Sequence, residues 1–272
     1  MAFDGIFLYL VKNEISEKIV GARVDKIYQP SREEILITFR SREGSHKLLL
    51  SAKADSARIQ FTEQFIENPA KPPMLTMLLR KLLSSAKLTD IKQDGFERIL
   101  TLVFDARNDL GDPTEYKLVI EIMGKYSNII LLDSSDKIID CVKRIDFSKS
   151  SVREILPGLK YELPPSQNKM NILTDSIFDI ETEMKSLATT RGKAAGKVIQ
   201  GISPIVANEI DFDMSLSQLK EHISHPVPTV VILDKPKDFT YFMPRQFGDL
   251  CTYKTFDTFS ELIDYFYFEQ VK

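Results

Sequence analysis

Up to about residue 145, apolar and polar residues alternate at the two-residue spacing that places one face of a β-strand against a core. Alternating segments that we expect to form strands lie at 23–29, 34–40, 47–51, 58–62, 88–93, 99–104, 116–122, 128–132 and 138–142. Short polar turns separate them, which is typical of antiparallel meanders. Two segments, 6–20 and 74–86, have helical spacing instead, and Gly21 is expected to stop the first helix. This half is therefore predicted to be α+β.

The segment 74–86 follows two prolines, which favour the start of a helix. Its spacing predicts an apolar face directed toward the core, made by Met74, Met77, Leu78 and Leu82. The opposite face would carry Arg80 and Lys81.

The pattern changes after an irregular stretch, 144–166, that ends in Leu163-Pro164-Pro165-Ser166. Helical spacing follows at 177–187, 193–199, 203–210 and, near the C-terminus, 256–268, with strand-like alternation at 229–233 and 239–243. We therefore expect two domains, 1–170 and 171–272, of which the second is mainly helical.

Composition narrows the possible functions. The net charge is −3, so contact with a nucleic acid would have to come from a local basic patch. His222 and His225 have no other histidine or cysteine near them in the sequence, so neither a metal site nor a cofactor is expected.

Two cysteines alone, Cys141 and Cys251, are typical of a protein in a reducing compartment. With no basic leader and no long apolar run, the expected location is the cytoplasm.

Three segments are candidates for binding RNA. The first is a basic stretch with Arg80 and Lys81 on a helix and Lys87, Lys92 and Arg98 downstream. A solvated helix face with scattered charge would give the same pattern.

The second candidate is the segment Glu121-Ile122-Met123-Gly124-Lys125-Tyr126-Ser127-Asn128. It runs from an apolar strand into a loop that is rich in hydrogen-bond donors and has an aromatic ring on which a base could stack. A plain hairpin turn between two core strands is an equally good interpretation.

The third candidate is a helix, a turn at Gly201-Ile202-Ser203, and a second helix that starts at Pro204. This is the helix-hairpin-helix pattern, whose turn can offer backbone N–H groups to a phosphate. Lys193, Lys197, Gly201 and Ser203 would make that contact. An ordinary pair of packed helices is the alternative.

Several motifs occur together in one order. They are Phe3-Asp4-Gly5, Asn68-Pro69, Pro72-Pro73, Met77-Leu78-Leu79-Arg80-Lys81, Gly95-Phe96-Glu97-Arg98-Ile99, Met123-Gly124-Lys125-Tyr126-Ser127-Asn128 and Gly201-Ile202-Ser203-Pro204. In these motifs the chain resembles the NFACT family, the Rqc2-like ribosome quality-control factors of the RqcH type. Bacterial members are also known as fibronectin-binding protein A-like. The family usually has Asp-Arg where this chain has Glu97-Arg98, and often Arg-His at Lys125-Tyr126.

The resemblance implies an N-terminal domain similar to that of formamidopyrimidine-DNA glycosylases, then a helix-hairpin-helix domain that leads toward a coiled coil beyond this chain. It implies a non-enzymatic factor that binds the large ribosomal subunit with a stalled peptidyl-tRNA. Such a factor recruits charged tRNA, alanyl-tRNA in bacteria, for C-terminal tailing of the nascent chain without mRNA. The RNA-binding residues implied are Glu97, Arg98, Glu121, Met123, Gly124, Lys125, Tyr126, Ser127 and Asn128.

Two other functions are weighed against this one. The fibronectin-related name suggests a cell-surface adhesin. The glycosylase-like fold suggests a DNA-processing enzyme, but those enzymes use an N-terminal proline as nucleophile, and this chain has Ala2-Phe3 there.

Overall fold

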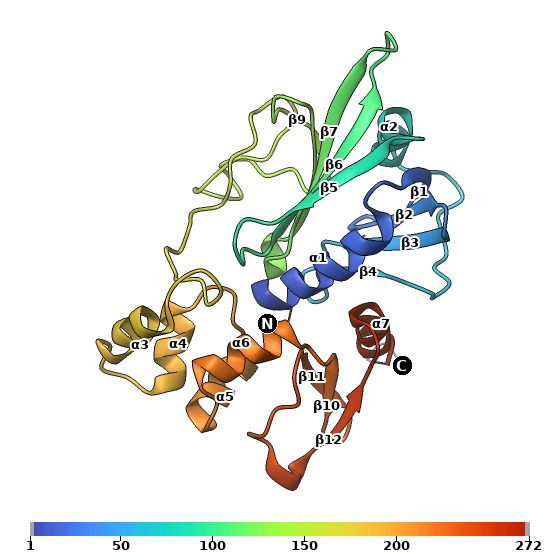
Figure 1. Ribbon diagram of the computed structural model, residues 1–272. Coiled ribbons are helices and arrows are strands. Elements are labelled where there is room, and N and C mark those ends of the chain that lie inside the picture. The colour runs from blue at the N-terminus through green and yellow to red at the C-terminus, as the bar shows by residue number, and fades with distance from the viewer. Residues whose placement is uncertain (1–2, 270–272) are drawn as a thin grey trace. The chain divides into compact units, whose positions relative to one another are not determined.

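The computed structural model describes residues 3–269 and packs as two units (Figure 1). The sheet unit contains residues 12–93 and 99–166. The helical unit contains the described residues up to 11, the short segment 94–98, and the chain from 167 onward. Ala2, which stands where the DNA glycosylases have their nucleophilic proline, lies outside the described residues. None of the described helices is long and apolar enough to cross a membrane.

One antiparallel sheet forms the sheet unit, and within the described residues its nine strands follow the order β4-β3-β2-β1-β5-β6-β7-β8-β9. The strands are β1 (Arg23–Ser31), β2 (Glu34–Ser41), β3 (Gly44–Ser51), β4 (Arg58–Phe61), β5 (Lys87–Lys92), β6 (Ile99–Arg107), β7 (Pro113–Glu121), β8 (Asn128–Leu132) and β9 (Ile138–Cys141). The two predicted meanders are joined where β1 pairs with β5. Helix α2 (Met74–Leu83) packs against β1 and β6.

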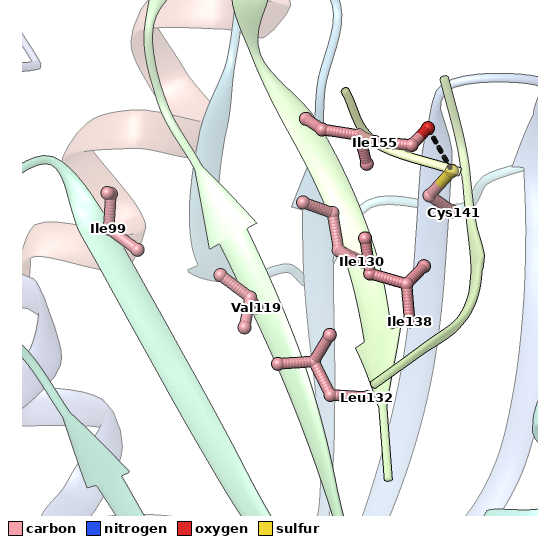
Figure 2. Packing of buried hydrophobic residues seen from close by; sticks show 7 residues of the cluster. All are labelled: Ile99, Val119, Ile130, Leu132, Ile138, Cys141 and Ile155. Carbon is pink, nitrogen blue, oxygen red and sulfur yellow. Dashed lines mark hydrogen bonds between the residues drawn. The ribbon is translucent and has the colours of Figure 1, made fainter. Parts of the chain in front are cut away.

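Side chains from β6 to β9 form an apolar cluster on the sheet (Figure 2). It contains Ile99, Val119, Ile130, Leu132, Ile138, Cys141 and Ile155. The Cys141 thiol donates to the carbonyl oxygen of Ile155 at 3.8 Å, and burial raises the pKa of this thiol to about 12. Cys141 is therefore a packing residue, and Ile155 attaches the irregular segment after β9 to the sheet.

The helical unit contains α3 (Ile177–Lys185), α4 (Arg191–Val198), α5 (Pro204–Phe212), α6 (Leu216–Ser224) and α7 (Phe259–Glu269). Within the described residues, a small sheet of β10 (Thr229–Ile232), β11 (Pro236–Thr240) and β12 (Thr252–Thr255) accompanies them. Helix α1 (Gly5–Ile19) begins in this unit, where Phe7 contacts Phe239 and Phe259 at ring-centroid distances of 4.9 and 5.1 Å.

The α+β class and the antiparallel strands are confirmed. Helix α6 and strand β12 were not expected from the sequence, because short elements bounded by polar residues leave a weak periodic signal. The chain leaves the sheet unit after Ser166, and the segment 94–98 packs with the helical unit.

The predicted inward face of α2 is wrong. Met74 and Met77 are 87% and 60% exposed, while Thr76, Leu79 and Leu83 are buried. Two polar contacts to β1 set this rotation. The Thr76 hydroxyl donates to Gln29 Oε1 at 2.9 Å, and Arg80 Nε donates to the carbonyl oxygen of Ile27 at 2.8 Å.

This rotation can be tested by truncating two apolar residues on the same helix. We expect Leu79→Ala to lower the free energy of unfolding by about 2–5 kcal/mol, because it leaves a cavity in the core. Met77→Ala, the matched control, should change it by less than about 0.5 kcal/mol. Chemical denaturation measures both; equal losses would contradict the observed face.

Candidate nucleic-acid interface

The loop between β7 and β8 presents two side chains to solvent on a fixed backbone. Residues Gly124–Tyr126 form one 3₁₀ turn, for which Gly124 adopts a φ of +57°. The backbone N–H of Met123 donates to Ser127 Oγ at 2.8 Å and closes the loop. Lys125 and Tyr126 are exposed at its tip, with Lys125 Nζ 5.0 Å from the centre of the Tyr126 ring.

Asn128 fastens the end of this loop to the segment after β9. Its Nδ2 donates to the carbonyl oxygen of Lys143 at 2.8 Å, and the backbone N–H of Lys143 donates to Asn128 Oδ1 at 3.0 Å. The side chain of Lys143 donates in turn to the carbonyl oxygen of Ala52 and forms an ion pair with Glu33 at 3.3 Å. Asn128 is itself 1% exposed, so it acts as a brace.

Glu121, at the end of β7, is fully buried and has both carboxylate oxygens occupied. Arg153 Nη2 donates to them at 2.6 and 2.7 Å, and the Tyr161 hydroxyl donates to Oε2 at 2.7 Å. Burial lowers the pKa of Arg153, but the hydrogen bond and charge of Glu121 outweigh this and raise it. Burial, together with the charge of Glu121, raises the pKa of the Tyr161 phenol. Arg153 therefore stays charged and Tyr161 stays neutral at physiological pH.

A cavity of about 430 Å³ opens between the loop and the irregular segment. Its lining residues are Met123, Lys125, Tyr126, Ser127, Asn128, Lys143, Ile145, Lys149, Ser150, Ser151, Val152, Arg153, Ile155, Pro164 and Pro165. The walls are mainly apolar, whereas the cations Lys125, Lys143, Lys149 and Arg153 stand around them. This volume lies in the range of small-ligand sites, and an apolar slot with an aromatic ring and ammonium groups suits a base and its phosphate.

Sequence reasoning found the loop but missed the residues facing it. Lys143, Lys149, Arg153 and Tyr161 come from the segment after β9, which has no regular period. One signal could have found Arg153: a carboxylate in an apolar strand, such as Glu121, needs a counter-cation.

Glu97 and Arg98 lie in a turn of the helical unit, which allows their side chains to share a site. The turn begins with Gly95 at a φ of +52°. Gln200 holds it: its Oε1 accepts from the Phe96 N–H at 2.9 Å, and its Nε2 donates to Glu97 Oε1 at 3.0 Å. Arg98 is half-buried; burial lowers its pKa, and the negative charges of Asp4 and Glu97 act in the opposite direction.

Asp4 joins two helix starts in the same unit. Its carboxylate accepts from the Phe7 N–H at 2.7 Å and from the Ser203 N–H at 2.9 Å. Burial raises the pKa of Asp4 to about 7, although both backbone hydrogen bonds lower it. The hairpin turn is closely packed here, because a Cβ on Gly201 would lie 2.6 Å from Phe96 Cβ. The Ser203 N–H therefore faces Asp4, and the hairpin offers a phosphate chiefly its exposed Lys193 and Lys197.

The sequence candidates thus belong to different units of the fold. The loop 121–128 belongs to the sheet unit, whereas Glu97, Arg98 and the hairpin belong to the helical unit. On α2, Arg80 lies 5.4 Å from the ring centre of Tyr28, and exposed Lys81 pairs with Asp109 at 3.1 Å. Among residues 3–269, no cluster of His, Cys, Asp and Glu could hold a metal ion.

The Glu121–Arg153 pair makes a stability prediction. Glu121→Gln should lower the free energy of unfolding by about 3–5 kcal/mol, because it leaves a buried guanidinium without its counter-charge. Glu115→Gln is the control on the same strand. Glu115 is 42% exposed and pairs with Lys117 at 3.8 Å, so its loss should cost less than about 1 kcal/mol. Similar losses in a denaturant titration would refute the assignment.

Asp4 predicts a pH dependence. Its folded pKa, about 7, exceeds the ordinary aspartate pKa of 3.8, so the folded state binds the extra proton between these values. Its contribution is fully present below pH 3.8 and is lost as pH rises through about 7. From pH 5 to 7, the parent protein should lose about 2 kcal/mol relative to Asp4→Asn, whose side chain does not titrate. Parallel stability curves for the two proteins would contradict a raised pKa.

Comparison with known proteins places this chain in a family. The family described as NFACT N-terminal and middle domains matches residues 4–272. "Rqc2 homolog RqcH" of Bacillus subtilis (strain 168) is 36% identical over 98% of this chain and 49% of its own length. The RqcH homologue of Streptococcus pneumoniae serotype 2 (strain D39 / NCTC 7466) is 39% identical over 78% of this chain and 38% of its own length.

Solved structures agree with this match. The N-terminal part of the fibronectin/fibrinogen-binding protein from Streptococcus suis has a TM-score of 0.86 at 33% identity, covering 99% of this chain and 100% of that one. The N-terminal domain of the fibronectin-binding protein PavA from Streptococcus pneumoniae has a TM-score of 0.72 at 32% identity, covering 99% and 100%. The chain spans about half the length of the Bacillus relative. It belongs to the NFACT family, to whose N-terminal and middle domains it corresponds.

Proposed function

We propose that this chain is the RNA-binding part of a ribosome quality-control factor. In this proposal the protein binds the large ribosomal subunit carrying a stalled peptidyl-tRNA. It also recruits a charged tRNA, such as alanyl-tRNA, so that the nascent chain is extended without mRNA. The peptidyl-transferase centre would perform the reaction, and this protein, working in the cytoplasm, would supply positioning only. The support from relatives is their name, Rqc2 homologue or RqcH.

The observation that carries the proposal is the cavity beside Lys125 and Tyr126. RNA loops present unstacked bases, which proteins bind by stacking on aromatic rings while cations neutralise the phosphates. Here a base would enter between the apolar walls, and Tyr126 would stack on it. Lys125 and Lys149, both exposed, would meet the flanking phosphates. A B-form DNA duplex would not offer such a base, because its bases are stacked and paired.

A second contact in this proposal comes from Arg98. Gln200 and Glu97 fix its turn, and a half-buried guanidinium can bind a phosphate with two parallel hydrogen bonds. Lys193 and Lys197 would add weaker phosphate contacts through the helix-hairpin-helix segment. The likeness to the N-domain of formamidopyrimidine-DNA glycosylases remains a prediction.

The test is tRNA binding at fixed salt by Lys125→Ala and Arg98→Ala. Losing one such contact should weaken binding roughly 5- to 150-fold, equivalent to about 1–3 kcal/mol. Lys26→Ala is the control, since Lys26 is an exposed lysine of β1 outside the cavity. Thermal melts of all variants identify any that fail to fold.

If both variants melt like the parent protein and bind tRNA as it does, the two contacts are not the site. The hairpin, with its exposed Lys193 and Lys197, then becomes the candidate. RNA recovered with the tagged protein from cells should be enriched in tRNA and large-subunit rRNA, and a profile equal to total RNA would refute the ribosomal role.

The second candidate function is a fibronectin-binding adhesin, which the names of the Streptococcus suis protein and of PavA favour. It requires the protein on the cell surface. Biotinylation of intact cells discriminates between the two functions: a labelled protein that binds immobilised fibronectin supports the adhesin. Protein labelled only after lysis supports the cytoplasmic factor.

A further inference from the structure

A second groove of the sheet unit, of about 660 Å³, gathers basic side chains from four elements. Arg23 begins β1, Lys81 lies on α2, Lys87 begins β5 and Arg107 ends β6. All four are exposed. In the sequence only Lys81 and Lys87 belonged to a basic stretch; Arg80 bonds to β1 instead, and the fold adds two arginines. The groove is therefore a product of the sheet topology.

The register of the sheet brings like charges together in this groove. Arg23 lies opposite Lys87 on β5 and also opposite Arg40 on β2, so three cations stand in one row across three strands. Like charges directly opposite one another destabilise a sheet. Asp25 neutralises Arg40 at 3.2 Å, and Asp105 lies opposite Lys87 on its other side. Arg23 thus has a cation opposite it on both neighbouring strands, whereas Lys87 has one cation and one carboxylate opposite it.

Few acids offset these cations. Asp105 lines the groove, and Asp109 forms an exposed ion pair with Lys81. Arg23 and Arg107 each hold their position with one guanidinium hydrogen bond, to the carbonyl oxygens of Ser85 and Gly111 at 2.9 and 2.8 Å. Each guanidinium therefore keeps other N–H groups that can meet an anion.

The other lining residues define what kind of anion fits. Ser84, Ser85 and Thr114 add hydroxyl groups, and no aromatic ring is among the lining residues described. A site of cations and hydroxyls without a ring can hold phosphates but offers a base nothing to stack on. The groove thus differs from the cavity beside Tyr126 in the part of a nucleic acid that it can recognise.

We propose that this groove binds the phosphodiester backbone of an RNA helix, as a second contact surface separate from the cavity beside Tyr126. The inference rests on the RNA-binding function proposed above and extends it to base-paired RNA. The spread of cations over α2, β1, β5 and β6 suits a strand of phosphates better than one small anion. The contact is electrostatic, so it should be independent of sequence and sensitive to salt.

The experiment measures binding of a blunt RNA duplex, which has no unpaired base for the cavity, over a range of salt concentrations. The groove variant is Lys81→Gln/Lys87→Gln. The matched control is Lys26→Gln/Lys160→Gln, which removes two exposed lysines of the same unit outside the groove. For the groove variant we expect duplex affinity to fall at least tenfold at low salt. The slope of log affinity against log salt should decrease by about 2.

Thermal melts separate binding from folding. Because Lys87 faces Arg23 on one side and Asp105 on the other, Lys87→Gln removes one repulsion and one attraction, so it should melt near the temperature of the parent protein while it binds the duplex more weakly. Equal losses of affinity in the groove and control variants would overturn the proposal, as would a duplex that the parent protein does not bind. Poly-glutamate serves as a probe for an acidic protein partner. If the groove variant still binds the duplex but no longer binds poly-glutamate, the proposal is also overturned, because the groove would then bind an acidic protein.

Failure of the proposed function gives a different result. Lys125→Ala should weaken tRNA binding but leave duplex binding unchanged, because the duplex does not use the cavity. If Lys125→Ala binds tRNA normally while the groove variant still loses the duplex, the base-binding cavity is refuted and the groove stands.

Discussion

A carboxylate that is fully buried at the end of a central strand is the constraint on which the candidate site depends. Glu121 would oppose folding as an unpaired charge, and the free energy needed to bury it is offset only when Arg153 and Tyr161 reach it. Both partners come from the irregular segment after β9, which has little regular hydrogen bonding of its own. The ion pair thus holds this segment together with the backbone hydrogen bonds between Ile145 and Ile155, and with it one wall of the cavity.

Hydrogen bonding of buried polar side chains also fixes the second wall of the cavity, which is the loop after β7. The loop after β7 is closed by Ser127 and tied by Asn128 to the backbone of Lys143, so its polar residues are used internally. Only Lys125 and Tyr126 are left exposed at the tip. Buried polar residues thus position the loop, and exposed ones remain for a ligand. This division explains how one short segment can serve both folding and recognition.

The helical unit contains a parallel arrangement around Asp4. The Asp4 carboxylate accepts hydrogen bonds from backbone N–H groups at the starts of α1 and α5. The side chain of Gln200 donates to Glu97 in the turn 94–98. The proton equilibrium of Asp4 lies near neutral pH because burial disfavours its charged form. The turn that carries Arg98 therefore rests on a hydrogen-bond network within its own unit.

Regular alternation predicted the strands well, because a half-buried strand repeats every two residues regardless of its partners. It could not predict that β1 joins β5, which depends on pairing between residues 64 apart, Arg23 and Lys87. The face of α2 was misassigned because Thr76 and Arg80, both polar, hold the helix to β1, whereas periodicity counts only apolar residues. The loop 121–128 was found from its composition, but Arg153 and the cation groove were not, since tertiary pairing creates them.

The most direct test of the cavity is ultraviolet crosslinking of the purified protein to tRNA, followed by mass spectrometry of peptide–nucleotide adducts. Crosslinking reports which side chain touches a base, which a binding constant does not. We expect adducts on Tyr126 and on peptides from 149–153, and their loss in Glu121→Gln if that variant remains folded. Adducts confined to the helices around Lys193 and Lys197, with none at Tyr126, would contradict it.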